Sequence, residues 1–187
     1  MALSLDLLRP IGERELWLLS ERNPGYQFER SPEGRLWVSP TGGQSGRRSL
    51  QLAYQLARWN EERGLGVVFD ASTGFKLPGG AILSPDASWV GKKRWEALSE
   101  EEKEGFPPLV PDVVFEVRSS SQGIEELRAK MTLYLKEGAR LGVLVDPYTR
   151  TVEVYRPGKE PERFEGVDTL SLEPELPGFA LQLAPLW

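Results

Sequence analysis

The sequence predicts an α/β fold, and the main evidence is a strand–helix–strand unit between Pro111 and Tyr155. Val113 to Arg118 is a β-branched and aromatic run, and Leu141 to Val145 is a second apolar run. Between these two strands, apolar residues recur at helical spacing from Ile124 to Leu135, and Gly138 ends the helix. Strands joined by such a crossover are expected to be parallel, with the helix covering the sheet.

The remaining elements follow from turn residues and hydrophobic periodicity. We expect, in chain order, an amphipathic helix at 11–22, a hairpin of strands at 26–29 and 35–38, a flexible Gly- and Ser-rich loop at 39–46, a long helix at 48–63, strands at 67–70, 75–77 and 84–90, an exposed charged helix or turn pair at 91–105, a hairpin strand at 151–156 and a last strand at 179–183. In the long helix, Leu52, Leu56 and Trp59 form a stripe that is expected to face the core.

We expect a single domain over residues 1–187, which is long enough to bury a substantial core. It would comprise an N-terminal helix and hairpin at 11–38, a core at about 47–156 and a C-terminal strand region at 170–187. The first residues have neither a basic lead nor a long apolar run, which predicts a cytoplasmic protein without a signal peptide or a membrane span.

The chain contains no cysteine and no histidine, and this limits its chemistry. Disulfides, zinc fingers, cysteine nucleophiles and Ser-His-Asp triads are excluded. Hydrolytic chemistry would have to use carboxylates, lysine, arginine, hydroxyl groups and a metal bound by oxygen, for which Mg²⁺ or Mn²⁺ is suited.

The overall composition is acidic, with a net charge of −5. This balance argues against non-specific coating of nucleic acid, although a local basic patch is enough for local contact with a phosphate backbone. The densest basic run, Lys92 to Arg94, would either steer a phosphate backbone or form ordinary solvated surface. Few methionines, many prolines and more arginine than lysine are typical of a thermophilic source.

The most informative residue is Glu116, a carboxylate within an apolar strand. Alternation places Val113, Phe115 and Val117 on one face of that strand, and Val114, Glu116 and Arg118 on the other. A buried carboxylate is costly unless it is paired or binds a metal. Two interpretations remain: an ion pair with Arg118 on the same face, or a metal-binding carboxylate of an active site.

A metal ion would need a second carboxylate close to Glu116. Asp112 lies four residues away along the same strand, about 13 Å at roughly 3.3 Å per residue, which is too far for two carboxylates to share one ion. Asp112 is therefore interpreted as part of the turn that enters the strand. Asp86 is the better candidate, because it stands on a separate strand directly after Pro85 and can project towards Glu116 from a neighbouring position.

A cationic group would offset the charge that builds up on phosphorus during hydrolysis. Arg118 is one candidate, about 7 Å along the strand from Glu116, although its high pKa makes it a stabiliser and not a base. Lys130 is the other candidate, since it flanks the apolar stripe of its helix. Lys130 has an alternative role as a surface residue that pairs with Glu126 one turn earlier.

The order of these residues carries a resemblance. Asp86, Glu116-Val117-Arg118 and Lys130, followed by Leu144-Val145-Asp146-Pro147, resemble the PD-(D/E)XK nuclease superfamily. Within it, the chain is similar over nearly its whole length to the large bacterial family of Uma-type restriction endonucleases. The matching segments are 28–29, 39–43, 84–89, 111–119, Lys130 with Tyr134, 145–147, 152–155 and 176–179.

The resemblance implies a restriction endonuclease-like fold with a mixed central β-sheet flanked by helices, and a Mg²⁺- or Mn²⁺-dependent phosphodiesterase site acting on DNA. Asp86 and Glu116 would be the metal ligands, with Lys130 taking the role of the superfamily lysine, whose usual position is occupied here by Arg118. The catalytic set is therefore Asp86, Glu116, Lys130 and Arg118. Glu29 matches a recurrent family glutamate without a defined role.

The expected function is a metal-dependent DNA endonuclease of the restriction or Holliday-junction-resolvase type, acting as a homodimer or larger homo-oligomer. Gln44 and Ser45 stand where the family often has an acidic residue or histidine, which leaves a catalytically inactive nucleic-acid-binding or accessory protein as the alternative. A third hypothesis is a purely structural domain in which Glu116 and Arg118 pair. The Gly-rich segment 42–46 lacks the Lys-Ser/Thr of a Walker motif and is not expected to bind nucleotide.

Overall fold

The computed structural model describes residues 3–187, which form two larger β-sheets and a two-stranded ribbon, together with helices. The main sheet has six strands. In spatial order they are β11 (Glu162–Glu165), β10 (Thr151–Tyr155), β9 (Leu141–Asp146), β8 (Val113–Val117), β7 (Ala87–Gly91) and β4 (Gly66–Asp70). β8 and β9 are parallel and the other neighbours are antiparallel, so the sheet is mixed and the predicted crossover is confirmed.

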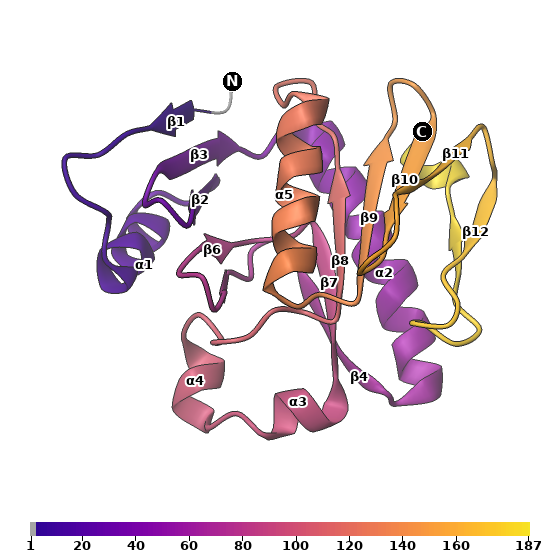
Figure 1. The fold of residues 1–187 in the computed structure, drawn as a ribbon, viewed down its shortest axis with the longest axis horizontal. Coiled ribbons are helices and arrows are strands. Elements are labelled where there is room, and N and C mark those ends of the chain that lie inside the picture. The colour runs from indigo at the N-terminus through magenta and orange to yellow at the C-terminus, as the bar shows by residue number, and fades with distance from the viewer. Residues whose placement is uncertain (1–2) are drawn as a thin grey trace.

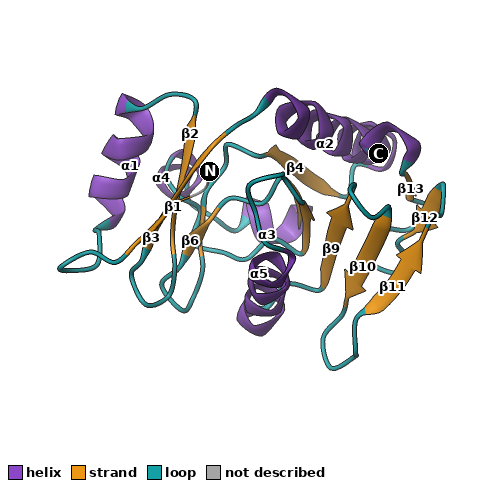
Figure 2. Cartoon of the chain, turned by 90° about the horizontal axis from the view of Figure 1, so that it is seen from above, coloured by secondary structure: helices purple, strands orange, loops and turns teal. Residues whose placement is uncertain are grey.

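Two long helices cover opposite faces of this sheet. α5 (Ile124–Glu137) lies in front of β8 and β9 in Figure 1, and α2 (Gly43–Arg63) lies behind them, an arrangement that Figure 2 shows from above. The predicted alternation on β8 is confirmed. Its odd-numbered residues pack in the core cluster that includes α2, whereas Val114 packs with residues of α5.

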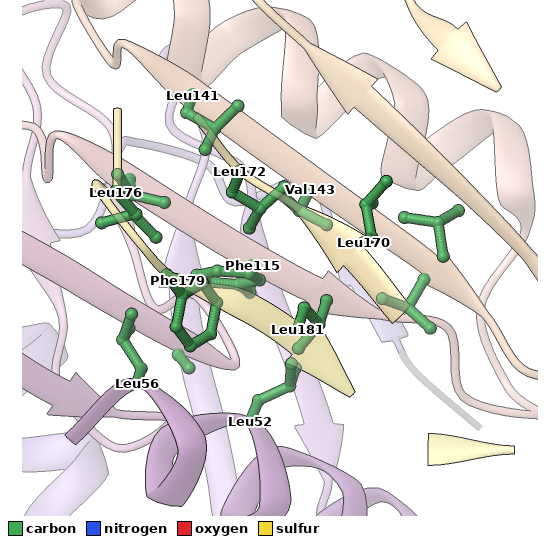
Figure 3. Close-up of a cluster of buried hydrophobic side chains, with 14 of the residues drawn as sticks. Leu52, Leu56, Phe115, Leu141, Val143, Leu170, Leu172, Leu176, Phe179 and Leu181 are labelled. Carbon is green, nitrogen blue, oxygen red and sulfur yellow. The ribbon is translucent and has the colours of Figure 1, made fainter. Parts of the chain in front are cut away.

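The core on the α2 side joins the sheet to the C-terminal region. Leu52 and Leu56 of α2 meet Phe115 and Val143 of the sheet and Phe179 of the C-terminal segment (Figure 3). This confirms the core assignment of the Leu52 stripe. The ribbon of β12 (Thr169–Ser171) and β13 (Ala180–Gln182), followed by a 3₁₀ turn (Ala184–Leu186), closes this side of the molecule.

The N-terminal part forms a second, antiparallel sheet of its own. Its order is β1 (Leu3–Leu5), β3 (Leu36–Pro40), β2 (Tyr26–Arg30), β6 (Ile82–Leu83) and β5 (Phe75–Lys76), and α1 (Glu13–Arg22) packs against β2. The predicted hairpin of β2 and β3 is present. The hairpin pairs with β6 through Arg30 and Ile82, and the Arg30 guanidinium donates to the Gly80 carbonyl. This sheet shares no strand with the central one.

Two expectations about local structure need correction. The loop predicted at 39–46 is shorter, because α2 begins at Gly43. The strand predicted at 84–90 begins at Ala87. The charged segment 91–105 resolves into two short helices, α3 (Lys92–Glu96) and α4 (Glu100–Glu104), the second with a capping box between Ser99 and Glu102. Within residues 3–187, no helix is long and apolar enough to cross a membrane.

Candidate active site

Asp86 and Glu116 lie side by side on neighbouring strands. Ala87 pairs with Phe115 and Ser88 with Val114, and the same register extended by one residue places Asp86 opposite Glu116. Directly opposed residues point to the same face of a sheet, with Cβ atoms about 4.5–5.5 Å apart. Both side chains line a cavity of about 830 Å³, hereafter the cleft, which is bounded by α1, β2, the start of α2, α4 and the loop after β8.

The α5 helix supplies the groups that hold Glu116. Lys130 Nζ lies 2.7 Å from Glu116 Oε1, and the Tyr134 hydroxyl donates to the same oxygen at 3.2 Å. Lys130 and Tyr134 are one helical turn apart, so both reach the same strand position. Lys130 is only 8% exposed, and the alternative in which it pairs with Glu126 at the surface is therefore wrong.

The alternative in which Glu116 pairs with Arg118 is also wrong. The Arg118 guanidinium pairs with Asp146 at the end of β9, with Nη1 and Oδ2 2.9 Å apart. It also lies over the ring of Tyr148, 5.5 Å from the centroid. The Arg118 side chain therefore contacts the end of β9, and the structural hypothesis based on a Glu116–Arg118 pair has no support in the observed contacts.

Glu29 reaches this site from the N-terminal sheet. Its Oε1 lies 2.9 Å from Lys130 Nζ and accepts the backbone N–H of Ser84 at 2.6 Å. Sequence reasoning singled out Glu29 without a role, and the contact gives it one: it fixes the position of Lys130 together with Glu116. Lys130 Nζ also donates to Glu29 Oε2 at 3.2 Å, so these two carboxylates engage the ammonium group through three oxygen contacts.

Two hydrogen bonds orient the carboxylate of Asp86. Oδ2 accepts the backbone N–H of Val117 at 2.7 Å, and Oδ1 accepts the Ser49 hydroxyl at 2.8 Å. The Ser49 hydroxyl also lies 3.0 Å from the Ser45 carbonyl. Because a hydroxyl has only one proton, it donates to one acceptor, and an ionised carboxylate is a stronger acceptor than a carbonyl. Sequence reasoning missed Ser49 because nothing along the chain links the first turns of α2 to the start of β7.

The acids of the site outnumber its cations. Burial raises the pKa of Glu116 to about 8; Lys130 opposes this, and the negative charges of Asp86 and Glu29 add to it. Burial also raises the pKa of Asp86, against the hydrogen bonds from Val117 and Ser49. Burial lowers the pKa of Lys130, but Glu116 and Glu29 outweigh it and the net pKa is raised. Lys130 is therefore a fixed positive charge and not a general base.

This shortage of positive charge matches a divalent cation. Asp86 and Glu116 present hard oxygen donors on one face of the sheet, which Mg²⁺ and Mn²⁺ prefer. Across residues 3–187, no group of three or more acids is arranged to hold a metal, and Lys130 contacts both Glu29 and Glu116. Two protein carboxylates are nevertheless a common set for Mg²⁺, whose remaining ligands are water and substrate phosphate.

Other residues considered from the sequence lie elsewhere. Asp112 accepts the Gly91 N–H at 2.8 Å and pairs with Arg94, which supports its interpretation as the entry to β8. Gln44 lies in the first turn of α2 and accepts a hydrogen bond from Arg47. The basic run from Lys92 follows the far end of β7, about 20 Å from Asp86 at roughly 3.3 Å per residue, and it does not line the cleft.

Comparison with known proteins shows the fold and the family of the chain. A crystal structure of a protein titled "putative nuclease" from Anabaena variabilis superposes with a TM-score of 0.75 at 21% identity, covering 95% of this chain and 97% of that one. This likeness shows a shared fold. A search of curated proteins finds no match. The family model Uma2, described as "Putative restriction endonuclease", matches residues 14–184. The chain thus belongs to the Uma2 family, and its fold is that of the restriction endonuclease-like proteins.

Proposed function

We propose that the protein is a Mg²⁺- or Mn²⁺-dependent DNA endonuclease that hydrolyses phosphodiester bonds. The observation that carries this proposal is the pair of opposed carboxylates, Asp86 and Glu116, with the buried Lys130 on one of them. Membership of a family described as restriction endonucleases supports nuclease activity in general. Because the chain has no histidine and no cysteine, hydrolysis would have to use groups of the kind found here.

Each residue of the site has a role that follows from its contacts. Asp86 and Glu116 would hold the ion, which when bound lowers the pKa of a water molecule and neutralises charge on the phosphate. Ser49 and the Val117 N–H keep Asp86 in one orientation. Lys130, held by Glu116 and Glu29, would place its positive charge near a phosphate oxygen on which negative charge develops. Arg118, which is bound to Asp146, is left out of this set.

A cleavage assay tests the proposal. Duplex, single-stranded and branched DNA are incubated with wild type, Glu116→Gln, Lys130→Met and the control Glu153→Gln, in Mg²⁺, Mn²⁺ or EDTA. Glu153 is also a buried strand carboxylate, but it pairs with Arg128 outside the cleft. Cleavage by wild type and Glu153→Gln alone, with no product in EDTA, is expected. Equal cleavage by Glu116→Gln would overturn the proposal.

The same assay decides between the types of nuclease. Preferential cleavage of branched DNA indicates a junction resolvase, whereas cleavage at a fixed duplex sequence indicates a restriction enzyme. A junction resolvase needs two active sites, so a homodimer is the oligomer that we expect for it. Sedimentation of the protein with and without branched DNA measures that state.

A catalytically inactive nucleic-acid-binding protein remains the second candidate. The observation in its favour is that Gln44, which stands where the family often has an acidic residue, binds Arg47. Gln44 therefore adds no third acid to the site. Calorimetry separates the two functions. Mg²⁺ binding that is lost in Asp86→Ala supports the enzyme, whereas DNA binding without any metal binding supports the inactive protein.

A further inference from the structure

The cleft is walled by aromatic side chains, two of which are exposed. Trp17 of α1 is 37% exposed and Tyr26 of β2 is 53% exposed, and both line the cleft. Trp17 is braced edge-on against Phe106 with ring centroids 5.3 Å apart, and Tyr26 lies 6.4 Å from Phe28. These contacts hold the rings in place while leaving part of each open to the cleft.

The charge of the cleft is unlike that of a surface for duplex DNA. The charged side chains that line it are five carboxylates and two lysines: Glu21, Glu29, Asp70, Asp86, Glu116, Lys103 and Lys130. Lys130 is already paired with two of those carboxylates. Proteins that hold a duplex do so chiefly by neutralising its phosphates with lysine and arginine. The walls of the cleft lack that capacity, and their aromatic content suits bases better than phosphates.

We propose that the cleft receives unpaired DNA, a single strand or an unstacked stretch of a branched molecule, whose bases stack on Trp17 and Tyr26. One phosphate of that strand lies at Asp86 and Glu116. This proposal rests on the function proposed above, because it names the substrate class of the same site. Aromatic stacking is how sequence-tolerant single-strand binding is commonly achieved, since every base has a π-face.

The size of the cleft agrees with such a substrate. Its volume of about 830 Å³ falls within the range of roughly 300–1,000 Å³ for pockets that enclose small organic ligands. Such a space holds individual nucleotides and not a base-paired helix. An unpaired strand also brings its backbone to the floor of the cleft, where Asp86 and Glu116 are opposed.

Binding without cleavage gives the direct test. Fluorescence anisotropy of labelled oligo(dT), and of a hairpin duplex with the same number of phosphates, is measured in EDTA with wild type, Trp17→Ala, Tyr26→Ala and Tyr54→Ala. Tyr54 on α2 is a matched control, because it is 56% exposed but does not line the cleft. We expect oligo(dT) to bind more tightly than the duplex. Loss of either cleft aromatic should weaken oligo(dT) binding by roughly 5- to 150-fold, the range for one stacked base.

The salt dependence adds a second readout. A single strand that is held mainly by stacking, with few cations near its phosphates, should show a shallow slope of log affinity against log salt. For two lysines at about −0.7 each, the slope should be no steeper than roughly −1.5. Equal or tighter binding of the duplex, or an unchanged affinity in Tyr26→Ala and Trp17→Ala, overturns the inference. Metal-dependent duplex cleavage that Glu116→Gln abolishes would then leave the proposed nuclease function standing.

Discussion

Lys130 and Glu29 form a buried ion pair of 2.9 Å. It joins α5, which covers the central sheet, to β2 of the N-terminal sheet. The pair ties the N-terminal sheet to the face of the central sheet that carries Asp86 and Glu116. Without it, Lys130 would keep Glu116 as its only carboxylate partner among residues 3–187. We therefore expect Glu29 to position the lysine and not to bind the metal.

Glu29→Gln should lower the cleavage rate while leaving metal binding largely intact. The amide removes the charge that holds Lys130. Substitution of a residue that orients a functional group typically lowers activity by roughly 10- to 100-fold. Glu21→Gln is the matched control, because Glu21 lines the cleft and is exposed. Cleavage rates under saturating Mg²⁺ and calorimetric Mg²⁺ affinities are compared. A fall in metal affinity as large as the fall in rate would contradict the positioning role.

Ser49→Ala should weaken Mg²⁺ binding by roughly 10- to 100-fold, the usual cost of losing a partner that orients a ligand. Its hydroxyl contacts Asp86 Oδ1 at 2.8 Å, and without it that oxygen is free to rotate away from the cleft. Ser45→Ala is the control, since Ser45 contributes its carbonyl to this contact and not its side chain. Calorimetric titration measures both variants. Equal Mg²⁺ affinities for Ser49→Ala and wild type would exclude the role given to Ser49.

Stability without metal should fall as pH rises, because of Glu116. Its pKa in the folded protein is raised from 4.5 to about 8, so the folded state retains a proton that the unfolded chain loses. The resulting stabilisation is fully present below pH 4.5 and is lost as pH rises through about 8. Each kcal/mol lost lowers Tm by roughly 2–4 °C for a chain of this size. Thermal unfolding in EDTA between these pH values measures the fall.

Glu116→Gln provides the comparison for that pH dependence. The amide does not titrate, so the variant should show a flatter dependence of Tm on pH than wild type. Mg²⁺ should restore the wild-type Tm at alkaline pH, because a ligand that binds only the folded state stabilises it. Parallel pH profiles for the two proteins would show that Glu116 is not the group responsible.

Much of the central fold could be predicted because its signals are local. The β8–α5–β9 unit is marked by β-branched runs, helical spacing and Gly138, and the parallel pairing followed from the crossover. Two of the strands that were missed have no such signal: β11 is charged and largely exposed, and β6 has only two residues. Their pairing depends on tertiary neighbours, as β6 shows by joining β2 through a single residue pair.

The residues of the candidate site could be recognised from the sequence where a charged residue departs from the pattern of an apolar strand. Glu116 stood out because a carboxylate interrupts an apolar strand, and Asp86 because Pro85 places it at a strand entry. The partners of these acids come from residues far away along the chain, as the contacts of Ser49 with Asp86 and of Glu29 with Lys130 show. Periodicity within one element cannot reveal such contacts, and for the same reason it could not tell that Arg118 would turn to Asp146.

Arg118→Ala should reduce stability while leaving Mg²⁺ affinity unchanged. The substitution leaves the buried Asp146 carboxylate without its cation, and an unsatisfied buried group costs roughly 1–3 kcal/mol.

Burial raises the pKa of Asp146, but the Tyr148 N–H and Arg118 outweigh it and the net pKa is lowered. The stabilisation from this pair is therefore present above pH 3.8 and is lost as pH falls further. Urea unfolding at neutral and acidic pH measures it, with Asp146→Asn as the partner variant. A loss of cleavage in Arg118→Ala at unchanged stability would instead return Arg118 to the catalytic set.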